Sequence, residues 1–333
     1  MTNGIHNISI IGDGAWGTTL AVYLAEKGHV IRLWGAFPKY VQRVQKNRYN
    51  DKFLPGIRIP DNVTMVEKLD AAIKETDIVV LAFPSKFAGT VLKKIAKTDL
   101  KGKIIVSVIK GIDHTTHLRM SEMIRKELGN VPLGVLSGPT IAMEIAQGIP
   151  STAVIASEDI HLAQKLQEIF NSEIFRIYSN TDVVGVEIGG SIKNIIAIAC
   201  GLCDGLKLGT NTKAAIVTRG LAEMARLGKV LGARTQTFSG LSGLGDLVTT
   251  CMSPQSRNRY VGEQLGKGKS IHSITESMNA VAEGVVTSKA VFDMSQKHGV
   301  SMPISTEVYN IIYKHKDPRK AVEDLMSRKA KAE

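Results

Sequence analysis

The sequence predicts an α/β domain with a doubly wound, mostly parallel sheet, followed by an all-helical C-terminal domain. Two patterns in its 333 residues support this prediction. In the first half, near-continuous apolar runs of strand length alternate with helical segments, as in a parallel sheet that helices cover on both faces. After about residue 180 the β-branched runs disappear and long helical patterns follow. We therefore expect two domains, residues 1–180 and 181–333.

Each predicted element follows from local pattern. Strands are expected over residues 8–11, 30–34, 77–83, 103–108 and 132–136. Helices are expected between them, over residues 15–27, 87–96 and 118–128, and residues 39–58 are predicted as a helix and a loop. In the second domain helices are expected over residues 183–206, 213–231, 257–265, 282–298, 304–313 and 318–326.

A glycine-rich turn joins the first predicted strand to the first helix. Residues 12–17 read GDGAWG, so Gly12, Gly14 and Gly17 form the pattern G-x-G-x-x-G, and the helix opens at Ala15 and Trp16. Gly12 permits the tight turn, Gly14 lets a pyrophosphate approach the backbone, and Gly17 lets helix and strand pack closely. The helix N-terminus then favours the anion. The pattern predicts dinucleotide binding in a Rossmann-type domain and hence a redox enzyme, with an ordinary strand-to-helix turn as the alternative.

Composition limits the class of protein. A hydrophobic content of 44% is typical of a globular protein with a sizeable core. The N-terminus lacks a basic segment followed by an apolar stretch, and the apolar run at residues 195–202 is too short to span a membrane. Three cysteines are an odd number in a long chain, which argues against a disulfide framework, so we expect a reducing cytoplasm. Cys200 and Cys203 lie in an apolar helical run without a partner pair, which favours two buried small residues over a redox or metal site.

The net charge of +11 raises the possibility of nucleic-acid binding. The lysine and arginine residues are spread along the chain, however, and no basic helix or stripe with interleaved aromatic residues is found. Part of the excess lies in the tail at residues 327–333. A positive field also suits an enzyme whose cofactor and substrate both carry phosphate.

Several chemically useful residues follow predicted strands. Ligands bind at the carboxyl ends of the strands in such sheets, and Lys110, Gly138 and Thr140 lie at two of these ends. A lysine here is placed to meet both cofactor and substrate, although a surface lysine in a loop is the ordinary alternative.

Lys193 and Asp246 are the candidates for proton chemistry. Lys193 lies within an apolar helical run, where a lysine is unusual unless it has a functional role. The alternative is a side chain that snorkels to the surface of a partly exposed helix face. Asp246 follows two glycines that let the backbone bend toward a ligand; its carboxylate can pair with a lysine or cap the helix that follows. Thr250 lies one turn further on. Ser256, Arg257 and Asn258 form a helix start that suits a phosphate.

These segments together resemble one family. They read GGSIKN at residues 189–194, GLSGLGDLVTTC at 240–251, SRNR at 256–259 and VAEG at 281–284, with the turn at 12–17 and SGPTIA at 137–142. In this order they are similar to bacterial-type NAD(P)-dependent glycerol-3-phosphate dehydrogenase, and the resemblance extends from about residue 5 to residue 324.

The resemblance implies a role for each matching residue. Lys193 is implied as the catalytic acid and base, with Lys110 and Asp246 as further catalytic residues. The implied substrate-binding residues are Lys110, Gly138, Thr140, Lys193, Asn194, Asp246, Thr250, Ser256, Arg257 and Asn258. The implied cofactor-binding residues are Gly12, Gly14, Ala15, Trp16, Gly17, Lys110, Ala142, Arg257, Val281 and Glu283. Glu283 otherwise fits a first-turn glutamate that favours the helix dipole. No metal is implied.

The implied reaction interconverts sn-glycerol 3-phosphate and dihydroxyacetone phosphate and supplies glycerol 3-phosphate for phospholipid synthesis. A cytoplasmic homodimer is implied, without nucleic acid and without integral membrane association. A related hydroxy-acid dehydrogenase with a helical second domain is the main alternative, and a nicotinamide-binding regulator without turnover is another. The +11 charge also leaves a membrane-surface role open.

The sequence bears on the choice between the two nicotinamide cofactors. An acid after the second strand binds the ribose 2′-OH of NAD(H), whereas an arginine there accepts the 2′-phosphate of NADP(H). This chain has Ala36 where family members commonly carry arginine or histidine, and Lys39 or Arg43 can reach a 2′-phosphate from the next helix. The cofactor is therefore expected to be NADP(H) and/or NAD(H), with a preference for NADP(H).

Overall fold

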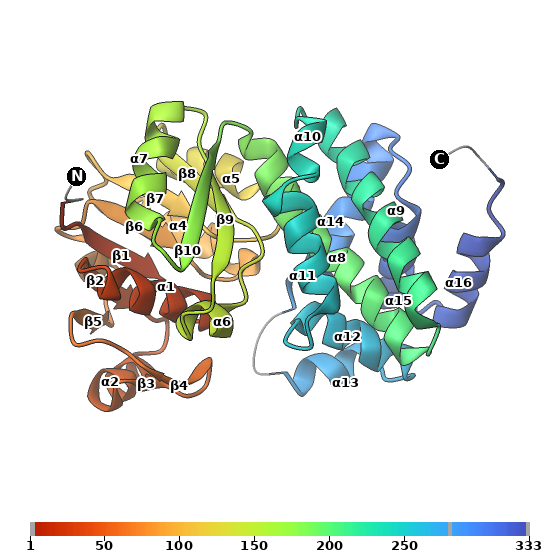
Figure 1. Cartoon of the computed structure of the whole chain (residues 1–333), viewed down its shortest axis with the longest axis horizontal. Helices are drawn as coiled ribbons and strands as arrows, with labels where there is room; N and C mark the ends of the chain where they lie inside the picture. Colours follow the sequence, from red (N-terminus) through yellow and green to blue (C-terminus); the bar gives the residue numbers. More distant parts are fainter. Residues whose placement is uncertain (1–3, 279–281, 331–333) are drawn as a thin grey trace. The chain divides into compact units, whose positions relative to one another are not determined.

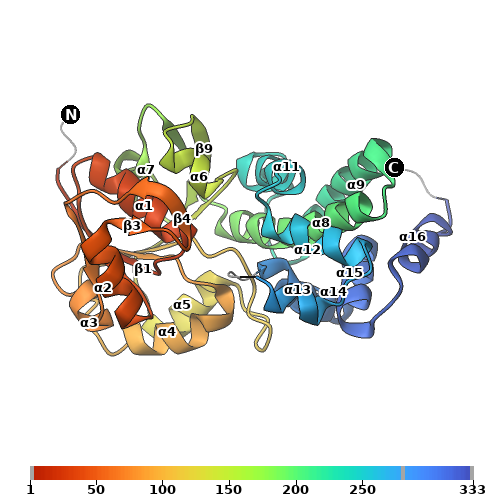
Figure 2. The ribbon, with the colours of Figure 1, turned by 90° about the horizontal axis from the view of Figure 1, so that it is seen from below.

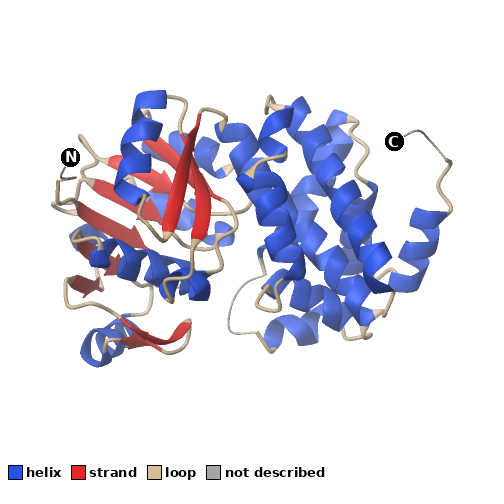
Figure 3. Cartoon of the chain, in the orientation of Figure 1, coloured by secondary structure: helices blue, strands red, loops and turns tan. Residues whose placement is uncertain are grey.

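The computed structural model describes residues 4–278 and 282–330. Internal contacts divide the chain into two units, one of Met1–Lys110 and Leu118–Glu187, the other of Gly111–His117 and Ile188–Glu333. The boundary expected between residues 180 and 181 stays a prediction; it falls just ahead of the long helix α8. The strands lie in the first unit and the described residues of the second unit form helices, which confirms the predicted fold class (Figure 3).

The first unit is built on an eight-stranded sheet with the order β10-β9-β8-β7-β6-β1-β2-β5. Neighbouring strands pair in parallel, except β8 and β9, which are antiparallel. The strands are β1 Asn7–Ile11, β2 Val30–Trp34, β5 Val63–Val66, β6 Ile78–Leu81, β7 Ile104–Ser107, β8 Leu133–Ser137, β9 Ser151–Ala156 and β10 Phe175–Asn180. The predicted mostly parallel sheet is therefore confirmed, with β5, β9 and β10 beyond the strands that the sequence pattern indicates.

Helices cover both faces of this sheet (Figures 1 and 2). They are α1 Ala15–Glu26, α2 Pro38–Asn47, α3 Leu69–Ile73, α4 Ala88–Ile95, α5 Met120–Leu128, α6 Ala142–Ala146 and α7 Ile160–Phe170. Because successive strand side chains point to opposite faces, Ile10 joins one core cluster with α1 and α7, while Ile11 joins the other with α4 and α5. The alternation of buried side chains thus explains the double winding.

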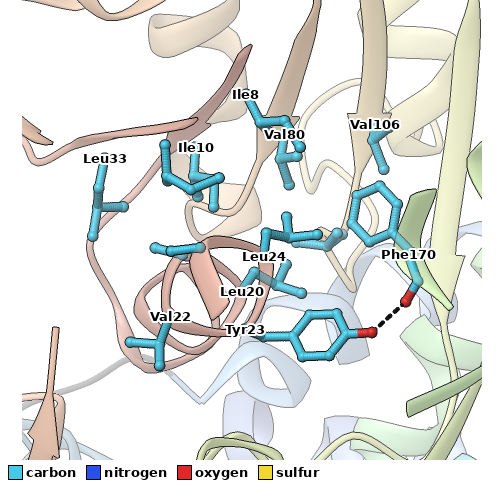
Figure 4. Close-up of a cluster of buried hydrophobic side chains, with 14 of the residues drawn as sticks. Ile8, Ile10, Leu20, Val22, Tyr23, Leu24, Leu33, Val80, Val106 and Phe170 are labelled. Carbon is cyan, nitrogen blue, oxygen red and sulfur yellow. Dashed lines mark hydrogen bonds between the residues drawn. The ribbon is translucent and has the colours of Figure 1, made fainter. Parts of the chain in front are cut away.

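The core against α1 shows how the apolar sequence fixes this helix (Figure 4). Leu20 and Leu24 are fully buried with Ile8 and Val80 from the sheet. Tyr23 is buried too, and its hydroxyl donates a hydrogen bond of 2.6 Å to the carbonyl oxygen of Phe170 at the end of α7. This bond satisfies the one polar atom of the tyrosine side chain, so the ring packs without leaving a buried donor unpaired.

Residues 39–58 differ from the predicted helix and loop. Helix α2 is present, but the segment after it forms a small antiparallel ribbon of β3 (Tyr49–Asn50) and β4 (Leu54–Arg58). The sequence Leu-Pro-Gly-Ile-Arg at residues 54–58 suggests a turn because proline and glycine are depleted in strands. The short edge pairing with β3 overrides that local preference.

The second unit is a set of packed helices. Its members are α8 Val183–Gly205, which starts within the last residues of the first unit, α9 Gly209–Val230, α10 Thr235–Phe238, α11 Asp246–Met252, α12 Arg257–Gly266, α13 Ile271–Glu276, α14 Glu283–His298, α15 Pro303–Lys314 and α16 Pro318–Met326. Glycines bring α8 and α12 into backbone contact: a Cβ on Gly201 would lie 1.9 Å from the carbonyl oxygen of Arg259.

Helix α8 is long and apolar enough to cross a membrane by length and composition, alone among the described helices. Its side chains are nearly all buried in the fold, which is the property of a core helix. Cys200 and Cys203 lie in this helix and are buried free thiols, as is Cys251 of α11, so the pair is not a disulfide here.

Candidate active site

The glycine-rich turn of the first unit has the backbone geometry that the sequence predicts for it. Gly12 has a φ of +126°, and a Cβ there would lie 2.6 Å from the carbonyl oxygen of Ala82, just after β6. A Cβ on Gly17 would lie 1.9 Å from the carbonyl oxygen of Gly12. Both positions therefore exclude a side chain, which brings α1 close to the end of the strand.

The N-terminus of α1 suits an anionic group. Gly14 is the N-cap, its backbone is extended, and no side chain caps the helix. A Cβ on Gly14 would meet nothing within 4 Å, so a ligand can approach the backbone N–H groups of the first turn. Ala15 and Trp16 open the helix, and the Trp16 ring packs edge-on against Phe175 at 6.4 Å between centroids. These residues fit a dinucleotide pyrophosphate.

A second cluster lies at the carboxyl ends of β7 and β8 in the same unit. The Lys110 ammonium donates hydrogen bonds to the Gly138 carbonyl oxygen at 2.9 Å and to the Thr140 hydroxyl at 3.2 Å. Gly138 itself has a φ of +141°. Nearby in sequence, Ala142 is the first residue of α6, and its carbonyl oxygen accepts a hydrogen bond of 3.1 Å from the Thr19 hydroxyl of α1. Lys110 is thus held at the ligand edge of the sheet, unlike a free surface lysine in a loop.

Lys193 and Asp246 form a buried ion pair in the second unit. Lys193 lies mid-way along α8 and is 6% exposed; Asp246 is the first residue of α11 and is 1% exposed. The Lys193 ammonium lies 2.5 Å from Asp246 Oδ1 and 2.7 Å from the Thr250 hydroxyl. The snorkelling alternative is wrong because the ammonium is buried and paired.

The local backbone explains why Asp246 reaches α8. A π-helical turn over Leu241–Gly245 precedes α11, and a Cβ on Gly189 of α8 would lie 2.4 Å from the Ser242 carbonyl oxygen. Glycine at position 189 therefore lets this turn pack directly on α8. The N-cap of α11 is Gly245, so the alternative that Asp246 caps the helix is wrong, and its carboxylate accepts from Lys193 instead.

Amide side chains tie three helices together next to Lys193. Asn258 of α12 donates to Asn194 Oδ1 at 2.9 Å and accepts at 2.9 Å from the backbone N–H of Gly284, in the first turn of α14. Asn194 and Asn258 are both buried, so their amides are satisfied within the protein. A Cβ on Gly284 would lie 2.6 Å from the Asn194 carbonyl oxygen, so this glycine permits the close approach of α14.

The start of α12 carries the predicted phosphate-binding residues. Ser256 is the N-cap and its hydroxyl accepts from the Arg259 backbone N–H at 3.2 Å. Arg257 is the first helical residue; burial lowers the pKa of its guanidinium, and the charge of Glu283 opposes that shift. Glu283 is the first residue of α14 and is also placed to favour the dipole of that helix.

The structure therefore gathers the predicted residues into separate groups within each unit. The first unit holds the glycine-rich turn and the Lys110 cluster; the second unit holds the Lys193 pair, the amide cluster and the start of α12. Val281 lies outside the described residues. Within the described chain, no group of three or more histidine, cysteine or acidic side chains is placed to hold a metal ion.

Sequence reasoning missed two residues beside the glycine-rich turn. Asn50 of β3 donates at 2.8 Å to the Asp13 carbonyl oxygen and at 2.7 Å to the Thr18 hydroxyl, so it supports the turn from outside the motif. Asp13 is itself buried. An acidic side chain between the first two glycines was a visible signal for Asp13; no sequence signal pointed to Asn50.

Comparisons with known proteins cover nearly the whole chain. The family model described as NAD-dependent glycerol-3-phosphate dehydrogenase N-terminus matches residues 7–163, and the model for the C-terminus of the same family matches residues 182–323. The two models follow the order of the α/β segment and the helical segment.

Individual relatives belong to the same family as the two models. A glycerol-3-phosphate dehydrogenase [NAD(P)+] of Prosthecochloris aestuarii is 47% identical, covering 98% of this chain and 99% of its own. One of Geobacillus kaustophilus is 46% identical, covering 99% and 96%. The crystal structure of glycerol-3-phosphate dehydrogenase from Coxiella burnetii is 38% identical with a TM-score of 0.94, covering 97% and 99%. A D-mandelate dehydrogenase structure, 15% identical with a TM-score of 0.60, shares the fold alone.

Proposed function

Because the chain belongs to the NAD-dependent glycerol-3-phosphate dehydrogenase family, we propose that it interconverts sn-glycerol 3-phosphate and dihydroxyacetone phosphate with NAD(P)(H). The relatives bearing that name cover nearly all of this chain at up to 47% identity. The observation that carries the catalytic part of the proposal is the buried pair of Lys193 and Asp246.

The first unit binds the dinucleotide. The turn at Gly12, Gly14 and Gly17 and the N-terminus of α1 would hold the pyrophosphate, as their fit above supports. When bound, the reduced nicotinamide supplies the hydride that the ketone carbon C2 accepts. Lys110, fixed by Gly138 and Thr140, places a positive charge at this edge of the sheet, where it would contact both cofactor and substrate.

Lys193 moves the proton. As C2 becomes tetrahedral, its oxygen gains negative charge and must take up a proton. The Lys193 ammonium donates that proton, and its neutral amine accepts it in the reverse direction. Asp246 and Thr250 hold the Nζ atom at 2.5 and 2.7 Å. Because the ion pair is buried, this position is defined before the substrate arrives, which lowers the reorganisation that the reaction requires.

The start of α12 binds the substrate phosphate. The Arg257 guanidinium offers a fork of N–H donors, and the helix N-terminus adds its dipole. The Ser256 hydroxyl accepts from the Arg259 backbone N–H, and its own O–H can still donate to a phosphate oxygen. Asn258 and Asn194 fix α12 against α8, which holds Arg257 at a set distance from Lys193 along the second unit.

We further propose the physiological setting that the family resemblance implies. Reduction of the ketone is the working direction, and its product supplies the glycerol backbone of phospholipids. The enzyme acts in the cytoplasm as a homodimer. Light scattering of the purified chain tests the dimer: twice the mass of one 36.0 kDa chain is expected, and the mass of a single chain would contradict it.

The test of the catalytic proposal is the oxidation of NADH and NADPH by dihydroxyacetone phosphate, followed by the absorbance of the reduced cofactor. Lys193→Ala should abolish turnover and leave cofactor binding intact, because Lys193 acts in the chemical step. Lys229→Ala, which removes an exposed lysine at the end of α9, is the matched control and should keep full activity. Turnover of a 2-keto acid without turnover of dihydroxyacetone phosphate would favour the hydroxy-acid alternative.

A further inference from the structure

Asp13 is a buried acid that the proposed mechanism does not use. It is the second residue of the glycine-rich turn and is 8% exposed, and its Oδ2 atom has no hydrogen-bond partner among the described residues. Loss of hydration raises its pKa to about 6, against the opposing effects of its own backbone N–H and the charge of Lys52. A carboxyl group held this way destabilises the fold, and local costs of this kind are typical of functional sites.

The carboxyl group lies at the end of β2. A Cβ on Gly35, the residue after β2, would lie 2.3 Å from Asp13 Oδ2. The turn and the strand end are also joined by a hydrogen bond of 2.9 Å from the Gly12 backbone N–H to the Trp34 carbonyl oxygen. Any side chain at Gly35 would therefore occupy the volume that the Asp13 carboxyl fills.

This position has a known chemical meaning in dinucleotide-binding sheets. An acid at the end of the second strand accepts a hydrogen bond from the ribose 2′-OH, and its charge opposes a 2′-phosphate. Here Gly35 and Ala36 occupy the strand end and neither is acidic. The glycine-rich turn instead brings the Asp13 carboxyl group beside Gly35, at this strand end.

Two cations, Arg43 of α2 and Lys52 between β3 and β4, lie over aromatic rings, and the charge of Lys52 also acts on Asp13. The Arg43 guanidinium of α2 lies over the Tyr40 ring at 4.7 Å, and the Lys52 ammonium lies over the Phe53 ring at 5.1 Å. The contact of Arg43 with the Tyr40 ring competes with its use as a 2′-phosphate ligand.

We propose that Asp13 sets the cofactor selectivity of this enzyme, favouring the 2′-hydroxyl of NAD(H) and disfavouring the 2′-phosphate of NADP(H). The inference rests on the proposed function. It replaces the preference for NADP(H) expected from Ala36, because that expectation considered only the residues that follow β2.

The test is the binding of NADH and NADPH to the full chain at low salt and about pH 8, measured by calorimetry. We expect the wild type to bind NADH more tightly than NADPH by about tenfold or more, the scale of one charge repulsion at a partly buried site. Asp13→Asn and Asp13→Ala should each lower the ratio of the NADPH to the NADH dissociation constant by about tenfold. Asp51→Asn, which removes an exposed carboxylate from the neighbouring ribbon, is the matched control and should leave the ratio unchanged.

Other results of the binding measurement separate the inference about Asp13 from the proposed function. Equal binding of the two cofactors by the wild type, or tighter binding of NADPH, would overturn the inference and leave the proposed function standing. Equal weakening of both cofactors in the Asp13 variants would make Asp13 a structural residue and would also overturn it. If neither variant folds, the wild-type ratio decides. Failure of both cofactors to bind the folded wild type would overturn the proposed function itself.

Discussion

Replacing Asp13 by alanine should stabilise the first unit at about pH 8, although it deletes a buried side chain. The reason is the raised pKa of this carboxyl group, which burial moves from 3.8 to about 6. An acid whose pKa is higher in the folded chain takes up protons on folding. Its destabilising effect is therefore nearly complete above about pH 6 and is lost as the pH falls through 3.8.

The magnitude follows from that difference. Each pKa unit between the folded and unfolded chain is worth about 1.4 kcal/mol, so a difference of about two units destabilises the folded unit by about 3 kcal/mol. The alanine variant leaves a small void, which costs about 1 kcal/mol. We expect a net stabilisation of about 2 kcal/mol at about pH 8 and a net destabilisation of about 1 kcal/mol near pH 3, below the unfolded pKa of 3.8.

Tryptophan fluorescence during urea unfolding is the assay. The chain has two tryptophans, Trp16 and Trp34, and both belong to the first unit, so their emission reports on that unit. With a urea dependence of about 2 kcal/mol per molar, the midpoint of Asp13→Ala should rise by about 1 M at pH 8. Asp51→Asn controls for net charge. An equal loss of stability at both pH values would show that the ionised, buried carboxyl group does not destabilise the folded unit.

Three further substitutions test the second unit. Asp246→Asn removes the charge that pairs with Lys193, which should lower the free energy of unfolding by about 3 kcal/mol. Urea unfolding followed by circular dichroism measures that free energy. A loss below about 1 kcal/mol would argue against a charged buried pair. Arg257→Ala should raise the KM for dihydroxyacetone phosphate by about tenfold or more with a smaller effect on kcat in steady-state assays; a fall in kcat alone would remove Arg257 from the phosphate site. Gly201→Ala places a Cβ 1.9 Å from the Arg259 carbonyl oxygen and should lower the free energy of unfolding by about 3 kcal/mol; an unchanged unfolding midpoint would contradict the close packing of α8 and α12.

The parts of the fold that sequence could predict are those fixed by local pattern. The turn at Gly12 and Gly17 was predictable because only glycine fits sterically at each position. In the structure, a Cβ added at either position would lie too close to a backbone carbonyl oxygen. The helical nature of the second unit was predictable from its periodicity. Strand β4 was not, because its Leu-Pro-Gly-Ile-Arg sequence opposes strand formation and only pairing with β3 establishes it.

The candidate site shows the same limit. Lys193 was predictable as a site residue because a lysine in an apolar helix needs a partner, but its pairing with Asp246 depends on how Gly189 admits the π-helical turn. Asp13 was visible as an acid between the first two glycines, but the role of its carboxyl group depends on its closeness to Gly35, which is 22 residues away in sequence. Sequence spacing alone does not report which side chain fills the volume at the end of β2.

Whether Lys193 moves the proton is decided by the initial rate of NADH oxidation by dihydroxyacetone phosphate, compared between the wild type and Lys193→Ala. We expect rapid, substrate-dependent oxidation by the wild type. For the variant we expect a rate near background, with NADH still bound at wild-type affinity. Wild-type protein that binds NADH but does not oxidise it with this substrate would contradict the proposed reaction, and a Lys193→Ala variant that retains turnover would contradict the role of Lys193.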